Sequence, residues 1–229
     1  MPEDHRKKWL WTELIIATRN NHKVRELNAL LERELGLPVV GLSRFSDIPE
    51  VVEDGETFEA NAVKKAEAVS RALNRPVVAD DSGLVVPALN GAPGVRSARY
   101  AGPEADDRAN NEKLLQALRG VEEKGREAFF VCVMALKIPG EEPRWVRGEC
   151  HGRIALEPKG THGFGYDPLF FLPEYGKTMG ELPPEQKNRI SHRAKASRQL
   201  LQLLKATYRF EGAASPERGE GGSASPHRQ

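Results

Sequence analysis

The sequence predicts a mixed α/β protein built around one sheet. In its first half, apolar runs of strand length alternate with segments that have the apolar spacing of amphipathic helices. In its second half, residues 128–136 are almost wholly apolar, as expected of a central strand that is covered on both faces. Residues 145–156 predict a strand that pairs with it, with Gly140 in the turn between the two.

The remaining elements follow from their boundary residues. Short strands are expected at residues 14–17 and 39–42, with a helix between them that ends at Gly36. Residues 77–84 form an apolar strand that leads directly into two aspartates, a serine and a glycine. Three further helices are expected, and their N-caps are Thr57, then Asp106 or Asp107, then Ser191.

Three regions are expected along the chain. Residues 1–12 are a loose N-terminal extension, residues 13–208 are the folded domain, and residues 209–229 are a disordered tail. From residue 211 onward only Gly, Ala, Ser, Pro, Glu, Arg, His and Gln occur, so the tail has nothing to bury. A domain of this size can bury a substantial core.

The composition excludes several classes of function. The 229 residues include 34 basic and 33 acidic ones, so no overall field favours a nucleic acid or a membrane as partner. Neither a signal peptide nor an apolar run of transmembrane length is present, and we expect a soluble protein of the cytoplasm. Two cysteines do not make a disulfide framework, and Cys132 lies in an apolar strand as a reduced core residue.

Two adjacent acids, Asp80 and Asp81, stand at the end of a buried strand. Paired carboxylates there lose stability unless a cation meets them. Asp81 together with Glu53 has the oxygen ligands that Mg²⁺ prefers. Successive strand residues point to opposite sides, so only one of the two aspartates need face a site. The alternative is that residues 81–83 are simply a turn.

The polar turn at residues 18–23 predicts an anion site. It places Thr18, Asn20 and Lys23 at the start of a helix, where backbone N–H groups are also free. The turn lacks the glycines of a P-loop, which argues against a Walker-type NTPase. An ordinary helix cap with a solvated lysine is the alternative.

Two later segments have the features of a base-binding site. In Phe164-Gly165-Tyr166-Asp167, glycine allows a close approach of the backbone and the aromatic rings can stack on a flat ligand. The alternative is a glycine-rich loop with aromatics that face the core. Lys187, His192 and Arg193 offer donors for a keto oxygen or a phosphate, although they also suit a solvated helix start. The other histidines have no metal-ligand spacing, so a zinc site is not predicted.

Taken in order, these motifs resemble the inosine triphosphate pyrophosphatase family, the pyrophosphatases of non-standard purine nucleoside triphosphates. The likeness extends over roughly residues 13–206. The matching segments are residues 17–23, 53–62, 64–66, 79–84, 91–100, 164–168 and 191–193. Arg19 departs from the pattern, because many relatives have a small residue there.

The resemblance implies an elongated mixed sheet flanked by helices, with two lobes and a central active-site cleft, and a homodimer. It implies Mg²⁺-dependent hydrolysis of ITP, dITP and XTP to a nucleoside monophosphate and pyrophosphate, which removes deaminated purines from the nucleotide pool. In this chain Asp81 would be the catalytic base, and Glu53 and Asp81 would hold Mg²⁺. The substrate-binding residues implied are Thr18, Arg19, Asn20, Asn21, His22, Lys23, Lys65, Ser82, Phe164, Gly165, Tyr166, Asp167, Lys187, His192 and Arg193.

Two other functions are considered. The Maf-like nucleotide pyrophosphatases share the general architecture and favour modified or pyrimidine triphosphates, but the pair His192-Arg193 and the loop at residues 164–167 argue against them. A non-catalytic nucleotide- or RNA-binding module is also compatible with the basic residues. The near-zero net charge and the paired acids oppose polyanion binding.

Overall fold

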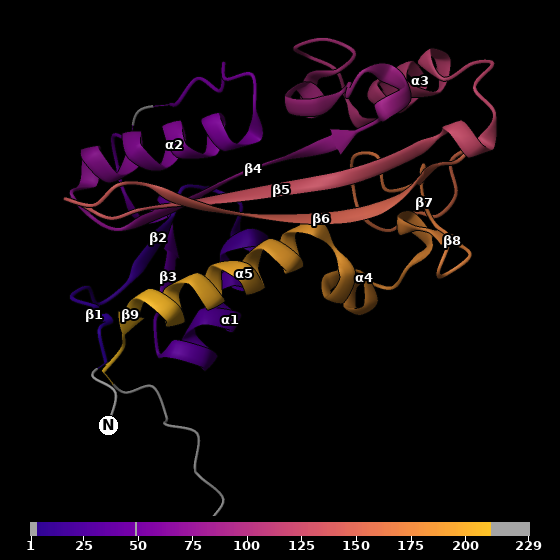
Figure 1. Cartoon of the computed structure of the whole chain (residues 1–229). Helices are drawn as coiled ribbons and strands as arrows, with labels where there is room; N and C mark the ends of the chain where they lie inside the picture. Colours follow the sequence, from indigo (N-terminus) through magenta and orange to yellow (C-terminus); the bar gives the residue numbers. More distant parts are fainter. Residues whose placement is uncertain (1–3, 49, 212–229) are drawn as a thin grey trace, which may run out of the picture.

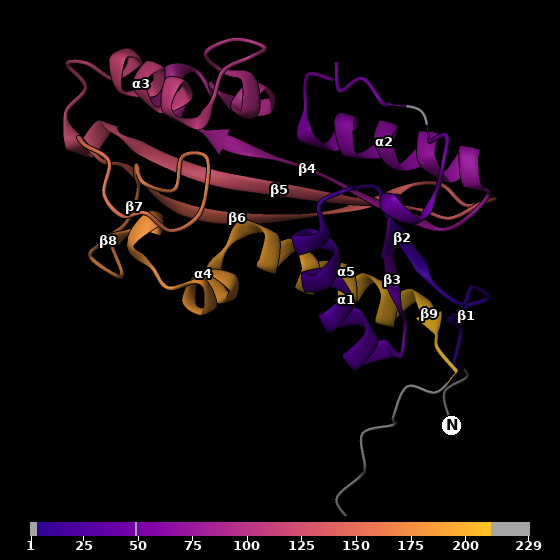
Figure 2. The same ribbon diagram turned by 180° about the vertical axis from the view of Figure 1, so that it is seen from behind.

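The computed structural model describes residues 4–48 and 50–211, and it confirms a mixed sheet flanked by helices (Figures 1 and 2). Seven strands lie in the order β3-β2-β4-β5-β6-β7-β8. Strands β3, β2 and β4 are parallel, and the others pair antiparallel. The strands are β1 (Lys7–Lys8), β2 (Leu14–Ile16), β3 (Val39–Gly41), β4 (Val77–Val85), β5 (Glu127–Lys137), β6 (Arg144–Ile154), β7 (Phe170–Leu172), β8 (Lys177–Thr178) and β9 (Tyr208–Arg209). The helices are α1 (Asn21–Leu35), α2 (Phe58–Leu73), α3 (Asp107–Ala117), α4 (Pro184–Ile190) and α5 (His192–Thr207).

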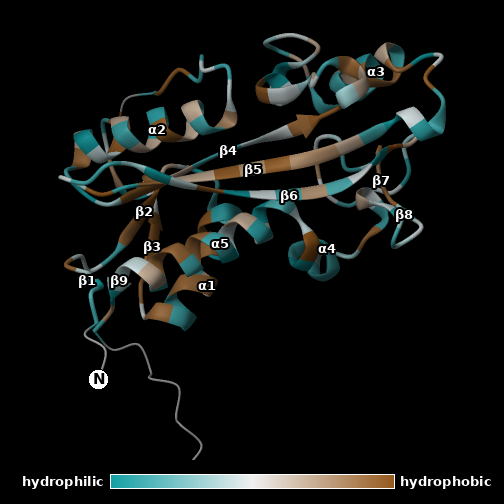
Figure 3. Cartoon of the chain, viewed as in Figure 1, coloured by the Kyte–Doolittle hydropathy of each residue, from teal (hydrophilic) through white to brown (hydrophobic). Residues whose placement is uncertain are grey.

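Strand β5 is the centre of the core, as its apolar sequence predicts. It pairs with β4 on one side and with β6 on the other, and residues 130–136 are all buried. One face packs against α1 and α5, and the opposite face packs against α2 (Figure 1). Figure 3 shows β5 and β2 as largely hydrophobic ribbons between helices of mixed character. Burying both faces of this strand removes apolar surface from water on each side of the sheet, which stabilises the fold.

The predicted helix caps Thr57 and Ser191 are confirmed, since each accepts a backbone N–H at the start of the helix that follows. Asn20 caps α1 in the same way. At α3 the cap is Asp106, which leaves the neighbouring Asp107 carboxylate free for other contacts. Gly148 of β6 lets α5 approach the sheet closely, since a Cβ there would lie 2.3 Å from the carbonyl oxygen of His192. The start of α5 is therefore fixed against β6.

The two ends of the chain correct the prediction of a loose extension. Residues of β1 pair in parallel with β9, so Arg209 belongs to the folded part and not to the tail. Trp9 is buried, and its ring packs against those of Tyr208 and Phe210. The three rings together bury enough apolar surface to order the N-terminal segment, although the residues just before Trp9 in that segment are charged. The rest of the predicted tail, from residue 212, lies outside the described residues.

Two further expectations concern the whole described chain. Within residues 4–48 and 50–211, every helix is too short or too polar to cross a lipid bilayer. Cys132 and Cys150 are both buried free thiols, as predicted for a chain without a disulfide framework. The division into two lobes stays a prediction.

Candidate active site

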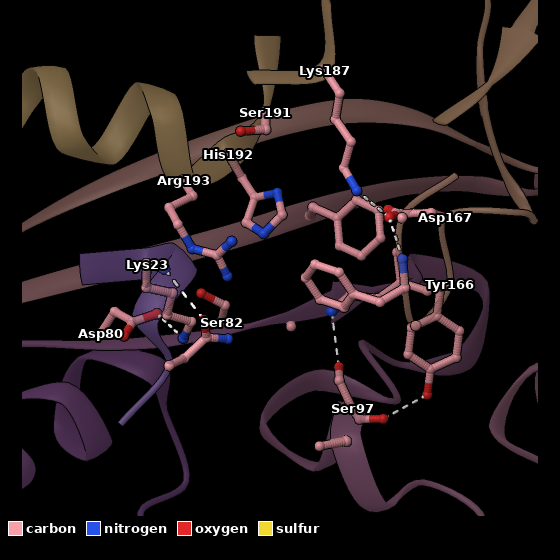
Figure 4. Close-up of a pocket in the computed structure, with 18 of the residues that line it drawn as sticks. Lys23, Asp80, Ser82, Ser97, Tyr166, Asp167, Lys187, Ser191, His192 and Arg193 are labelled. Carbon is pink, nitrogen blue, oxygen red and sulfur yellow. Dashed lines mark hydrogen bonds and ion pairs between the residues drawn. The ribbon is translucent and has the colours of Figure 1, made fainter. Parts of the chain in front are cut away.

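A pocket of about 680 Å³ lies along an open edge of β4. Strand β2 pairs with β4 only at Val77 and Val78, whereas β5 pairs with β4 along its whole length. Beyond Val78, one edge of β4 therefore faces the pocket. The predicted site residues that line it are Asn20, His22, Lys23, Glu53, Lys65, Asp81, Ser82, Phe164, Gly165, Tyr166, Asp167, Lys187, His192 and Arg193. Figure 4 shows side chains from β4 and from α5 converging on this space.

Both aspartates line the pocket, which corrects the expectation that only one need face it. They lie on a continuous strand and not in a turn, and they do point to opposite partners. Asp80 Oδ2 accepts from Lys23 Nζ of α1 at 2.6 Å, and Asp81 Oδ2 accepts from Asn61 Nδ2 of α2 at 2.9 Å. Because this part of β4 is an edge, side chains from both faces of the sheet reach the same cavity.

The two carboxylates differ in their electrostatics. Burial favours the neutral form of Asp80, but the charges of Lys23 and Arg193 outweigh it and hold its pKa below the usual range. Burial raises the pKa of Asp81, and the charge of Glu53 adds to this effect against the opposing hydrogen bond from Asn61. Asp80 is therefore a fixed counter-ion, whereas Asp81 is the better proton acceptor of the pair.

Three lysines of the pocket are each paired with a carboxylate. Lys23 is paired with Asp80, Lys65 contacts Glu53, and Lys187 contacts Asp167 (Figure 4 shows the last pair). Among the described residues, six carboxylates and four cationic side chains line the pocket. A polyanionic ligand would therefore meet excess negative charge and would need to bring a cation with it.

The loop at residues 162–167, here called the aromatic loop, exposes Phe164 and buries Tyr166. Phe164 is 62% exposed, and Lys187 Nζ lies 5.0 Å from the centroid of its ring. Tyr166 is buried, and its hydroxyl donates to the carbonyl oxygen of Ser97 at 2.8 Å. The prediction that either ring can stack on a ligand is thus narrowed to Phe164, while Tyr166 packs into the core.

Polar atoms without partners in the pocket wall point to a ligand. Within the described part of the chain, His192 Nδ1, Arg193 Nε and Ser82 Oγ are buried and form no hydrogen bond. All three residues line the pocket, and Figure 4 shows His192 and Arg193 extending from the start of α5 toward it. Leaving such groups unpaired costs about 1–3 kcal/mol each, so a ligand that pairs with them gains that free energy.

His192 is held neutral by its surroundings. Burial, together with the charges of Arg193 and Lys187, lowers its pKa to about 3. Its ring stacks on that of Phe130, with centroids 4.9 Å apart. At neutral pH one ring nitrogen therefore carries a hydrogen and the other accepts one.

The buried neutral histidine makes stability depend on pH. Between pH 6.5 and about 3 the unfolded chain binds a proton at His192 that the folded chain does not, so folding becomes less favourable as pH falls. Above pH 6.5 the free energy of unfolding keeps the whole contribution of the neutral His192. Below pH 6.5 that free energy declines by about 1.4 kcal/mol per pH unit. Chemical denaturation of wild type and His192→Phe between pH 4.5 and 6 measures this. We expect the difference between the two free energies to change with that slope; parallel pH curves would contradict it.

Three predicted residues lie outside the pocket lining. The hydroxyl of Thr18 accepts from the N–H of Asn20, and the side chains of Arg19 and Asn21 are exposed. Asn20 Oδ1 accepts from the N–H groups of His22 and Lys23, so its amide caps α1. This part of the turn thus matches the helix-cap alternative, while Lys23 reaches into the pocket.

Sequence reasoning missed Asn61. It is 1% exposed, its Nδ2 donates to Asp81, and its Oδ1 accepts from the N–H of Gly55 at 2.7 Å. It therefore ties the acidic turn that contains Glu53 to the aspartate on β4. A polar residue among the apolar positions of a helix is the signal that could have identified it, because buried amides require partners.

A mixed α/β fold whose pocket combines acidic side chains, lysines, an exposed ring and unpaired donors suits a charged ligand with a flat ring. The model of the Ham1 family matches residues 14–203. This chain belongs to the Ham1 family.

Individual relatives agree with this assignment. A protein of Geobacillus kaustophilus named dITP/XTP pyrophosphatase is 56% identical over 188 residues, which are 82% of this chain and 92% of that protein. A protein of the same name from Bacillus subtilis is 51% identical over 194 residues, 85% of this chain and 98% of that one. The solved Staphylococcus aureus Ham1 protein is 44% identical, has a TM-score of 0.79, and covers 84% of this chain and 98% of its own.

Proposed function

We propose that this chain hydrolyses non-standard purine nucleoside triphosphates (dITP, XTP and ITP) to the monophosphate and pyrophosphate. The observation that carries the proposal is that one pocket joins the carboxylates of Asp81 and Glu53 to the unpaired side-chain nitrogens of His192 and Arg193. Relatives that match most of the chain are named dITP/XTP pyrophosphatase. Such an enzyme would remove deaminated purines before polymerases incorporate them. We further propose that it acts as a homodimer.

The residues present fit a magnesium ion. Glu53 and Asp81 both line the pocket, and Glu53 is close enough to Asp81 to raise its pKa. Mg²⁺ typically takes one or two carboxylates and completes its shell with water and substrate phosphates. Among the described residues no cluster of three or more His, Cys, Asp or Glu side chains could hold a metal alone. When bound, Mg²⁺ would neutralise phosphate charge and polarise the bond that breaks.

The lysines would bind the phosphates. Lys23 and Lys65 line the same part of the pocket as the two aspartates, and Lys65 Nζ also donates to the carbonyl oxygen of Asp80 at 3.1 Å. Each ammonium pairs with a carboxylate of the pocket. A triphosphate would draw the Lys65 ammonium away from Glu53, and that carboxylate would then be free to act as a metal ligand. Charge developing on the leaving pyrophosphate would be stabilised by the lysines.

Asp81 would accept a proton from the attacking water. The water oxygen forms a bond to the α-phosphorus, the bond from that phosphorus to the bridging oxygen breaks, and pyrophosphate leaves. The raised pKa of Asp81 makes it a stronger base than an ordinary aspartate. Its two oxygens already accept from Asn61 and from the N–H of Ser82, so its orientation is fixed before substrate arrives.

The choice of base would rest on hydrogen-bond donors. Hypoxanthine and xanthine carry a 6-oxo group, which accepts, whereas adenine carries an amino group, which donates. Arg193 has a free donor at Nε, while the ammonium of Lys187 is engaged by Asp167. Adenine would leave a buried donor facing another donor. Phe164, as the exposed ring, would stack on the purine.

A panel of substrates tests this proposal. With Mg²⁺ present, we expect rapid turnover of dITP and XTP and slow turnover of dATP, dTTP and UTP. EDTA should abolish turnover, and added Mg²⁺ should restore it. Preferred hydrolysis of dTTP or UTP would favour the Maf-like activity. Tight binding of dITP without Mg²⁺-stimulated turnover would instead favour a nucleotide-binding module.

A further inference from the structure

One residue of the aromatic loop, Gly165, is held by two side chains of α3. The N–H of Gly165 donates to Asp107 Oδ2 at 2.7 Å, and Asn111 Nδ2 donates to the carbonyl oxygen of Gly165 at 2.9 Å. The two side chains are four residues apart, so they lie on the same face of α3. Asp107 can make this contact because Asp106 caps the helix. The backbone N–H and C=O of Gly165 are thus both hydrogen-bonded to α3, which lies more than fifty positions earlier in the sequence.

These contacts fix the backbone on which Phe164 is mounted. The N–H of Phe164 donates to Asp167 Oδ2 at 3.0 Å, so the peptide groups before and after Phe164 are both hydrogen-bonded. Gly165 has a φ of +61°, a left-handed conformation that glycine adopts readily. Phe164 is 62% exposed, and Lys187 Nζ lies 5.0 Å from the centroid of its ring. The backbone is thus hydrogen-bonded on both sides of Phe164 while the side chain remains exposed.

We propose that Asp107 and Asn111 are positioning residues that preorganise Phe164 to stack on the purine ring of the substrate. The inference rests on the proposed function, because it assigns the base to Phe164. Holding a binding surface in its bound shape before the ligand arrives improves affinity by avoiding the entropy loss of ordering it. Neither residue has a role at the phosphates, where Asp81 and the lysines lie. Their loss should therefore affect substrate binding and not the chemical step.

The isosteric change Asn111→Asp tests the clamp. It replaces the Nδ2 donor by an oxygen that faces the carbonyl oxygen of Gly165, with almost no change in volume. We expect KM for dITP to rise about tenfold while kcat stays within about twofold, as for loss of a hydrogen bond that orders the binding surface. Asp107→Ala should act in the same direction. Asp107→Asn retains an acceptor oxygen and should raise KM only about threefold.

A matched control lies on the same helix. Arg108 is next to Asp107, its side chain is 84% exposed, and its ion-pair partner is Glu112 on the outer side of α3. Arg108→Ala should leave both KM and kcat unchanged. Thermal melts of all variants show whether each one folds.

Amide hydrogen exchange without substrate gives a readout independent of activity. We expect faster exchange at residues 163–166 in Asn111→Asp and Asp107→Ala than in wild type or Arg108→Ala. Suppose that wild type hydrolyses dITP but Asn111→Asp and Asp107→Ala keep KM within twofold, or lose kcat at constant KM. The positioning role is then refuted, while the proposed function stands. If wild type hydrolyses neither dITP nor XTP, the proposed function is refuted, and the assignment of Phe164 to a purine falls with it.

Discussion

Replacement of Asp81 by asparagine is expected to lower kcat for dITP by about 10²- to 10⁴-fold with little change in KM. The amide has nearly the same shape as the carboxylate but cannot take the proton of the attacking water. Removing the charge relieves the cost that burial places on it, but the amide keeps only one acceptor oxygen for the two N–H donors of Asn61 and Ser82. Thermal melts of the variant therefore separate a lost rate from a lost fold.

The adjacent aspartate supplies the contrasting variant. Asp80 is buried and paired with Lys23, so Asp80→Asn leaves an ammonium without its partner. Such a change typically costs about 3–5 kcal/mol, and we expect the lower end because the Lys23 side chain keeps 23% exposure. Asp81→Asn should thus mainly affect kcat and Asp80→Asn mainly the free energy of unfolding. An Asp81→Asn enzyme with more than about a tenth of wild-type activity would contradict the assignment.

Replacement of Arg193 by alanine is expected to reduce the preference for dITP over dATP by about ten- to a hundredfold in kcat/KM. A site that hydrogen-bonds a substrate group discriminates strongly against an analogue that cannot pair with it. Arg193 Nε is a buried donor without a partner among the described residues, so a keto oxygen can satisfy it and an amino group cannot. Steady-state kinetics with both nucleotides measures the ratio.

The control for this substitution is Arg198→Ala. Arg198 is an exposed arginine on the same helix, and its side chain donates to the carbonyl oxygen of Arg189. It lies outside the pocket lining and should leave the ratio between the two nucleotides unchanged. If Arg193→Ala keeps the wild-type ratio of kcat/KM for dITP over dATP, another group must recognise the 6-oxo position. The role proposed for Arg193 in recognising the purine is then wrong.

Local signals predicted much of the fold correctly. The caps Thr57, Asp106 and Ser191 act within three residues along the chain, so the sequence nearby contains all that determines them. The apolar run of β5 needs only burial on both faces to become a central strand. The pairing of β1 with β9 depended on Trp9 meeting Tyr208 across the whole chain, and no local pattern indicates that contact.

The site was predictable as a set of residues but not in its geometry. Lys23 and Asp80 are 57 positions apart, and their pairing depends on how α1 and β4 pack. That both aspartates reach one pocket depends on where β2 stops pairing with β4, which is a property of the sheet and not of either residue. Likewise, only tertiary packing decides that Tyr166 is buried while Phe164 is exposed.

The central claim is that water attacks the α-phosphorus in this pocket. We would incubate the full chain with Mg²⁺ and dITP in ¹⁸O-labelled water and identify the products by ³¹P NMR and mass spectrometry. We expect pyrophosphate, with one ¹⁸O atom in the phosphate of dIMP. Release of orthophosphate, or ¹⁸O found in pyrophosphate, would mean attack at an outer phosphorus and would contradict the position assigned to Asp81.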